Sequence, residues 1–242
     1  RGESDIWGTL MWQTGHAVEA ADSNTRELPL ENRGAMAKSK SSKRWLAEHF
    51  DDPYVKQAQQ QGLRSRAAFK LQELQDKYAL IRPGMTVVDL GAAPGGWCQV
   101  AQPLVGPGGR VIALDILAME PLPGVAFILG DFTEAEPLGE LEQALDGAMV
   151  DLVMSDMAPN ISGMATVDQA KAMYLAELAL EFVRTHLKPG GDFVVKLFQG
   201  TDFDSFVLQV RSLFDKVRVI KPKASRPRSR EVYLLARGRQ VK

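Results

Sequence analysis

Three charged residues stand at the ends of otherwise apolar segments of this 242-residue sequence. Asp156 closes the run VDLVMSD, Lys196 lies near the end of DFVVKLF, and Glu231 opens the run EVYLLA. A lysine at the end of an apolar strand is costly to bury unless it is paired, although a solvated strand end would explain it equally well. If the last run is an antiparallel strand, its start lies on the same sheet edge as the other two residues, so strand topology alone can bring these two carboxylates and one amine together, the residue types that serve acid–base chemistry.

Short apolar segments alternate with helical ones over most of the chain, and the last two apolar segments are joined by about ten residues without a helix. Strands are predicted at 86–91, 110–115, 125–130, 150–156, 192–198, 218–221 and 231–236, and helices at 45–61, 65–80, from 96, and at 134–146, 168–187 and 202–214. This order predicts an α/β fold with a mostly parallel seven-stranded sheet, helices on both faces and an antiparallel last strand.

The glycine-rich turn 89–97 (DLGAAPGGW) follows the first predicted strand, where a doubly wound fold binds its ligand. Glycines let the backbone approach a ligand closely, and the helix that starts near Gly96 attracts an anion at its N-terminus. The turn differs from the dinucleotide pattern G-x-G-x-x-G, and Pro94 stiffens it. Asp89 adds an anion that suits an ammonium group better than a pyrophosphate.

Two more carboxylates follow at successive strand ends. Asp115 stands twenty positions after Gly95, where an acid accepts hydrogen bonds from ribose hydroxyls. Asp131 follows the third strand, where a carboxylate can accept from an adenine amino group. Each acid alone is weak evidence, because exposed acids are common after strands. As an ordered set with the glycine-rich turn, they favour S-adenosylmethionine over a nicotinamide dinucleotide.

The net charge of −1 conceals a strong segregation of sign. Segment 38–70 holds eight Lys/Arg against three acids, and 216–242 holds ten against one, whereas 111–170 holds eleven acids and no Lys or Arg. Basic clusters suit an anionic polymer, although each could also be an ordinary solvated face.

The remaining composition excludes several classes of protein. The single cysteine, Cys98, excludes an internal disulfide framework, and the three histidines show no metal-ligand spacing, so no metal site is predicted. No apolar run reaches the ~18 residues of a membrane span, and no signal pattern opens the chain. We therefore expect a cytoplasmic protein without a membrane partner. Residues 1–37 are expected to be an extension, with Met36 resembling a natural start, and 38–242 a single domain with a basic N-terminal helical segment.

Five segments in order resemble the FtsJ/RrmJ family of ribose 2′-O-methyltransferases, particularly its bacterial branch that acts on large-subunit ribosomal RNA. They are RSRAAFKL (64–71), VVDLGAAPGGW (87–97), VMSDMAPNISG (153–163), VVKLFQG (194–200) and SRPRSREVYLLA (225–236). The resemblance covers about residues 38–240 and implies a Rossmann-like, S-adenosylmethionine-dependent methyltransferase fold. It further implies a monomer that methylates a uridine of 23S rRNA within the assembled large ribosomal subunit.

The resemblance also assigns residues. The family's catalytic tetrad falls on Lys70, Asp156, Lys196 and Glu231, and its S-adenosylmethionine contacts fall on Gly95, Trp97, Asp115, Asp131 and Asp156. Whether Lys196 acts as a base or only orients the hydroxyl group is left open, because a lysine amine is ordinarily protonated at neutral pH. Methylation of another RNA such as tRNA, methylation of a nitrogen, and a catalytically silent RNA-binding ribosome-assembly factor remain alternatives.

Overall fold

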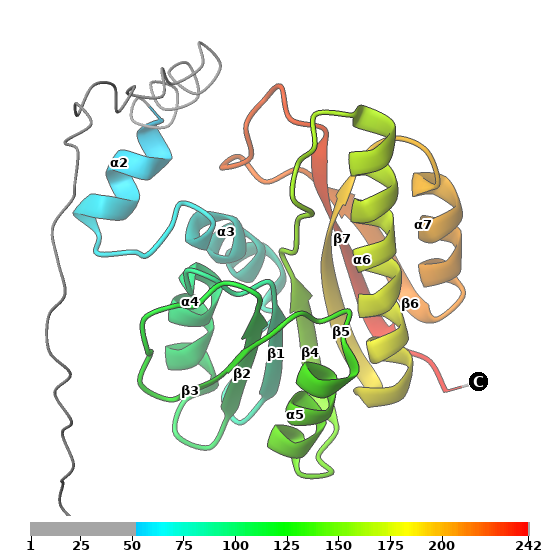
Figure 1. The fold of residues 1–242 in the computed structure, drawn as a ribbon. Coiled ribbons are helices and arrows are strands. Elements are labelled where there is room, and N and C mark those ends of the chain that lie inside the picture. The colour runs from blue at the N-terminus through cyan, green and yellow to red at the C-terminus, as the bar shows by residue number, and fades with distance from the viewer. Residues whose placement is uncertain (1–51, 242) are drawn as a thin grey trace, which may run out of the picture. The chain divides into compact units, whose positions relative to one another are not determined.

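The computed structural model describes residues 52–241, which lie within one compact unit, Lys40–Lys242 (Figure 1). The expected extension 1–37, the proposed start at Met36 and the first part of the predicted helix 45–61 fall outside the described residues.

The described residues form helices and strands in the predicted alternation. The helices are α2 (Pro53–Gln60), α3 (Ala68–Tyr78), α4 (Gly96–Val105), α5 (Ala135–Leu145), α6 (Ala165–His186) and α7 (Phe203–Arg211). The strands are β1 (Thr86–Leu90), β2 (Arg110–Asp115), β3 (Val125–Leu129), β4 (Val150–Ser155), β5 (Leu187–Phe198), β6 (Phe214–Ile220) and β7 (Glu231–Arg239).

The seven strands form one sheet in the order β3-β2-β1-β4-β5-β7-β6. All neighbouring pairs from β3 to β5 are parallel, and β7 runs antiparallel to both β5 and β6. The predicted fold class is therefore confirmed. Because β7 is reversed, its first residue lies beside the carboxyl ends of β4 and β5, the edge where open α/β sheets bind ligands.

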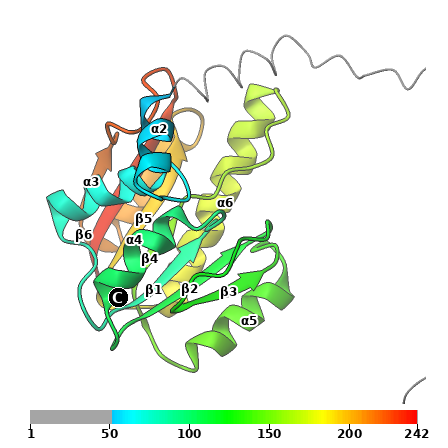
Figure 2. The ribbon, with the colours of Figure 1, turned by 90° about the vertical axis from the view of Figure 1, so that its left-hand side faces the viewer.

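Helices cover both faces of the sheet (Figures 1 and 2). On one face, α3 and α4 pack over alternate strand residues such as Val87 and Leu235. On the other, α5, α6 and α7 pack over the intervening residues, such as Val88 and Leu234. Since successive side chains of a strand point to opposite faces, each central strand contributes to both cores and reads as a continuous apolar run.

Strand bounds differ from prediction mainly in the C-terminal half. β5 begins at Leu187, five residues before the predicted start, because Leu187 pairs with Val150 ahead of a register irregularity. The sequence 188–191 (KPGG) has the composition of a turn, which conceals this pairing. β6 begins at Phe214, which pairs with Arg239 at the far end of β7.

Candidate active site

Four charged residues gather at the carboxyl ends of β4 and β5. Lys196 on β5 donates to Asp156, with Nζ 3.0 Å from Oδ1 and 2.5 Å from the backbone carbonyl oxygen. Lys70 on α3 lies 2.7 Å from Oε1 of Glu231 at the start of β7. The structure therefore brings the four predicted tetrad residues together as two ion pairs, each joining a lysine to a carboxylate.

Tyr233 connects the two ion pairs, and sequence reasoning missed it. Its hydroxyl group accepts a hydrogen bond from Lys70 Nζ at 2.9 Å and donates to Asp156 Oδ1 at 2.6 Å. Tyr233 is two residues beyond Glu231 on β7 and pairs with Lys196 on β5, so all three side chains share one face of the sheet. A polar aromatic two positions after a candidate acid is the signal that could have identified it.

The surrounding charges set the ionisation of this network. Burial by itself would raise the pKa of Asp156, but Lys196 and Lys70 and the hydrogen bonds from Tyr233 and Lys196 outweigh burial and hold that pKa below its usual value. Burial, followed by the nearby carboxylates Asp156 and Glu231, raises the pKa of Tyr233 well above its usual value. At neutral pH the site therefore holds an ionised Asp156 and a neutral tyrosine hydroxyl group.

Lys70 is deeply enclosed in the protein. Only 8% of it is exposed, because α3 lies on the face of the sheet that carries Tyr233. Its ammonium group also lies 5.3 Å from the centre of the Tyr233 ring. Its partner Glu231 is fixed independently, since Oε1 accepts from Ser225 Oγ at 2.9 Å and the backbone N–H donates to Ser229 Oγ at 3.1 Å.

A cavity of about 460 Å³ adjoins the tetrad at the carboxyl ends of β1, β2 and β4. Three of the predicted cofactor-binding residues line it: Asp115, Asp131 and Asp156. Asp115 accepts hydrogen bonds from the backbone N–H groups of Ala93 and Leu117, both at 2.8 Å, which fixes the turn after β1. The turn also needs Gly91, because a Cβ atom there would lie 2.8 Å from Met157.

The other two predicted cofactor-binding residues do not line this cavity. Gly95 caps the N-terminus of α4 with a φ of 99°, a conformation that favours glycine. Trp97 is 2% exposed, its Nε1 donates to the carbonyl of Ala67 at 2.8 Å, and its ring centroid lies 5.6 Å from that of Tyr233. The structure thus places Gly95 in the turn and Trp97 beneath the tetrad.

A buried carboxyl group lies under the glycine-rich turn. Asp89 is fully buried on β1, where Oδ2 accepts from Cys98 Sγ at 3.0 Å and Oδ1 has no partner among the described residues. Burial, reinforced by Asp156 and Asp115, raises the pKa of Asp89 to about 7. Burial and the neighbouring Asp89 raise the pKa of Cys98, which makes it a packed thiol and not a nucleophile. An unpartnered carboxylate oxygen beneath the turn suits a ligand with a positive charge.

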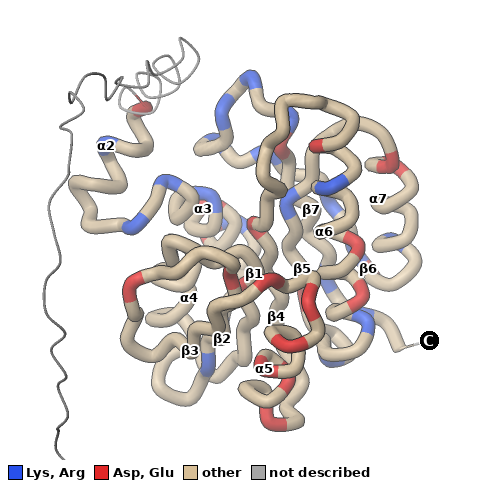
Figure 3. The backbone as a smooth tube through the Cα atoms, in the orientation of Figure 1, with Lys and Arg blue, Asp and Glu red and all other residues tan. Residues whose placement is uncertain are grey.

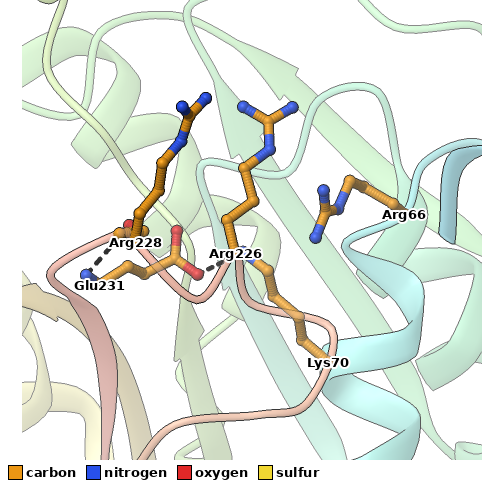
Figure 4. Close-up of a pocket in the computed structure, with 6 residues that line it drawn as sticks. Arg66, Lys70, Arg226, Arg228 and Glu231 are labelled. Atoms are coloured by element: carbon orange, nitrogen blue, oxygen red, sulfur yellow. Dashed lines mark hydrogen bonds and ion pairs between the residues drawn. The ribbon is translucent and has the colours of Figure 1, made fainter. Parts of the chain in front are cut away.

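A second, strongly basic cavity of about 500 Å³ opens beside Lys70 and Glu231 (Figure 4). Arg66, Arg226 and Arg228 line it, and Figure 3 shows basic residues on α3 and on the loop between β6 and β7. Asp52 forms ion pairs with Arg66 and, at 3.7 Å, with Arg226. The basic segments 38–70 and 216–242 thus contribute to one cavity next to the tetrad.

Arg64 belongs to the basic segment of the sequence, but its guanidinium group is used within the protein. It donates to the backbone carbonyls of Pro94, Glu120 and Pro121 at 3.2, 2.5 and 2.8 Å, and so joins the glycine-rich turn to the loop after β2. Within residues 52–241, no group of His, Cys, Asp and Glu could hold a metal ion, and no helix is long and apolar enough to span a membrane.

The fold and the cofactor cavity together define a class of protein. A seven-stranded sheet with a reversed last strand, a glycine-rich turn after β1 and acids after β2 and β3 are features of Rossmann-like methyltransferases. The chain belongs to the FtsJ-like methyltransferase family, whose sequence profile matches residues 63–239. Membership confirms the resemblance predicted from the five motifs and makes the chain a methyltransferase, a class that generally uses S-adenosylmethionine as its methyl donor.

The chain is similar along most of its length to curated bacterial proteins. It is 60% identical to Ribosomal RNA large subunit methyltransferase E of Chromobacterium violaceum over 205 residues, 85% of this chain and all of the relative. It is 59% identical to the protein of the same name from Pseudomonas aeruginosa, over 84% of this chain and 98% of the relative. A solved structure of a candidate ribosomal RNA methyltransferase from Plasmodium falciparum matches with a TM-score of 0.67 and 27% identity, covering 74% of this chain and all of that one.

Proposed function

We propose that this chain transfers the methyl group of S-adenosylmethionine to the ribose 2′-hydroxyl of a uridine in 23S rRNA. The observation that carries this proposal is the network of two lysine–carboxylate pairs joined by Tyr233, which borders both the cofactor cavity and the basic cavity. The relatives at about 60% identity are named as large-subunit ribosomal RNA methyltransferases. The proposed catalytic residues are Lys70, Asp156, Lys196 and Glu231, and the proposed cofactor-binding residues are Gly95, Trp97, Asp115, Asp131 and Asp156.

The described residues fit S-adenosylmethionine. The unpartnered Oδ1 of Asp89 lies beneath the turn that would receive the ammonium group, and Asp115 and Asp131 line the cavity where hydroxyl and amino groups would bind. Gly91 lines the same cavity and lets Met157 pack closely against the turn. When bound, the cofactor supplies a methyl group on a positively charged sulfur, which is already a good leaving group.

The protein's task is then to position the nucleophile and manage its proton. Two of the three N–H donors of the Lys196 ammonium group are directed at Asp156. The third remains for the ribose oxygen, so the geometry favours Lys196 as the group that orients a lone pair of that oxygen toward the methyl group. The ribose oxygen would take the methyl group as the C–S bond breaks, and the hydroxyl proton would pass to solvent water. Asp156 fixes Lys196, and Glu231 with Tyr233 fixes Lys70.

The basic cavity supports RNA as the acceptor. A ribose 2′-hydroxyl distinguishes RNA from DNA, and cationic side chains hold the phosphates of the same strand. Arg66, Arg226 and Arg228 surround a space that also reaches Lys70 and Glu231. We further propose that the substrate is the assembled large subunit, that the chain acts as a monomer, and that the reaction takes place in the cytoplasm.

The test supplies undermethylated large ribosomal subunits and labelled S-adenosylmethionine, and then maps the ribose that resists alkaline cleavage. Wild-type protein should protect one uridine of 23S rRNA, and Lys196→Ala should lose transfer by about 10²–10⁴-fold while it retains cofactor affinity. Methyl label found in tRNA, or on a base of any RNA, would contradict the proposed substrate and favour one of the alternatives. Cofactor binding without any transfer would indicate a silent RNA-binding factor.

A further inference from the structure

A third cavity, of about 370 Å³, shares lining residues with each of the other two. Its volume lies within the ~300–1,000 Å³ range of small-ligand sites. Its wall comes from four segments: the loop between β4 and α6, the first turns of α6 with Asp168 and Gln169, the end of β5, and the residues before β7. The lining includes Pro159, Ile161, Phe198, Ser229 and Arg230.

Three of these segments, the loop after β4, the end of β5 and the residues before β7, lie next to proposed catalytic groups. Pro159 follows Asp156 by three residues, Phe198 follows Lys196 by two on the same strand, and Ser229 precedes Glu231 by two. Two strand residues span about 6–7 Å, so the cavity begins within one nucleotide's width of the lysine. Pro159 also lines the cofactor cavity, and Ser229 also lines the basic cavity, which makes the three cavities neighbours around one centre.

The chemistry of the lining differs from that of the other two cavities. Ile161 lies on the loop after β4 and is 70% exposed, so its apolar side chain is available for contact with a ligand in the cavity. Phe198 supplies an aromatic ring. Arg230 is exposed, and its side chain has no partner among the described residues. Apolar contacts with an aromatic ring and an arginine plane are the means by which proteins hold an unstacked nucleobase.

We propose that this cavity binds the nucleobase of the nucleotide whose 2′-hydroxyl is methylated, an inference that rests on the proposed function. The base is attached to the ribose carbon next to the one that bears the 2′-hydroxyl, so a hydroxyl group held at Lys196 places its base beside the tetrad. The cofactor takes one of the three adjoining cavities, and the arginine-lined one suits phosphate. The base takes the third.

The wall of the cavity is held by Gln169 on α6. Its side-chain amide donates to the carbonyls of Phe198 and Thr201 at 2.9 and 3.2 Å, which fixes the chain just after β5. Gly200 is required there, because a Cβ atom at this position would lie 2.9 Å from the Gln169 amide. The backbone that carries Phe198 is therefore held by contacts within the protein.

The first experiment measures single-turnover methyl transfer to undermethylated large subunits by wild type, Ile161→Ala and Phe198→Leu. Loss of base contacts should slow transfer by about tenfold or more at subsaturating subunits, with cofactor affinity unchanged. Leu208→Ala is the matched control, because Leu208 is a 64% exposed apolar residue on α7. It should match wild type.

The second experiment detects contact between the methylated nucleotide and the protein directly. Large subunits are reconstituted with 23S rRNA in which a fraction of the uridines is replaced by 4-thiouridine. These subunits are then irradiated in the presence of the cofactor-loaded protein. The methylated nucleotide should crosslink to peptides that contain 157–164 or 198–200. Wild-type rates for both variants, together with crosslinks of that nucleotide only outside these peptides, would overturn the inference and leave the proposed function intact. Absence of transfer by the wild-type protein would instead overturn the proposed function itself.

Discussion

Asp89→Asn tests whether the buried carboxyl group under the glycine-rich turn titrates in the folded protein near neutral pH. The side chain is completely buried, and burial is the main cause that raises the pKa of Asp89 from 3.8 to about 7. Between about pH 4 and 7, the folded state therefore keeps a proton on Asp89 that the unfolded chain has already released. Because the native state binds more protons in this window, the free energy of unfolding falls as the pH rises through it and levels off above about pH 7.

The size of the effect follows from the shift in pKa. A difference of about 3 units at 1.36 kcal/mol per unit gives a total of about 4 kcal/mol, of which roughly 3 kcal/mol falls between pH 5 and 8.5. Asparagine keeps an acceptor for the Cys98 thiol and carries no charge, so this contribution disappears in the variant. The added amide donor changes stability by an amount that is independent of pH and leaves the slope unaffected.

Urea unfolding of the cofactor-free chain at several pH values between 5 and 8.5 measures the effect. Wild type should lose roughly 3 kcal/mol relative to Asp89→Asn across this range. Asp146→Asn is the control, because Asp146 is exposed and has a φ of 50°, a left-handed conformation that asparagine tolerates. Its profile should run parallel to wild type. Parallel profiles for wild type and Asp89→Asn would refute the assignment of a near-neutral pKa to Asp89.

Three further predictions concern the site. Asp156→Ala should weaken cofactor binding in a titration and also reduce transfer by about 10²–10⁴-fold, because Asp156 holds Lys196 and lines the cofactor cavity. Tyr233→Phe should keep the buried ring but slow single-turnover transfer by about tenfold or more. The acid limb of its pH–rate profile should move to higher pH, because the hydrogen bond from Tyr233 holds the pKa of Asp156 down and its loss raises that pKa. Arg226→Gln/Arg228→Gln should reduce the salt slope of RNA affinity by about 2.

Each of these predictions has a distinct contradictory outcome. Unchanged cofactor affinity in Asp156→Ala would show that Asp156 does not contribute to cofactor binding. A pH–rate profile in Tyr233→Phe that coincides with wild type would show that its hydroxyl group does not influence Asp156. For the arginines, the matched control is Arg184→Gln/Arg211→Gln on α6 and α7, which removes the same charge from elsewhere on the protein. Equal salt slopes for the two double variants would remove the basic cavity from the RNA-binding surface.

Much of the site could be predicted from local patterns in the sequence. A few neighbouring residues are enough to identify the strand and helix periods, the turn 89–97 and the acids Asp115 and Asp131. Parallel strands bring their carboxyl ends to one edge of the sheet whatever the details of side-chain packing. The same logic anticipated that Asp156, Lys196 and Glu231 lie together, because the reversal of β7 follows from a connection too short for a helix.

Only the tertiary structure decided how these groups are paired. That Tyr233 stands opposite Lys196 depends on the register between β5 and β7, and a shift of one residue would turn the tyrosine to the other face. That Lys70 reaches Glu231 depends on how α3 packs on the sheet, across 161 positions of sequence. Arg64 illustrates the same point, because its charge suggested a phosphate ligand whereas its neighbours use its donors for three carbonyls. Composition and spacing determine which groups are present, but the distances between remote groups are set by packing and register.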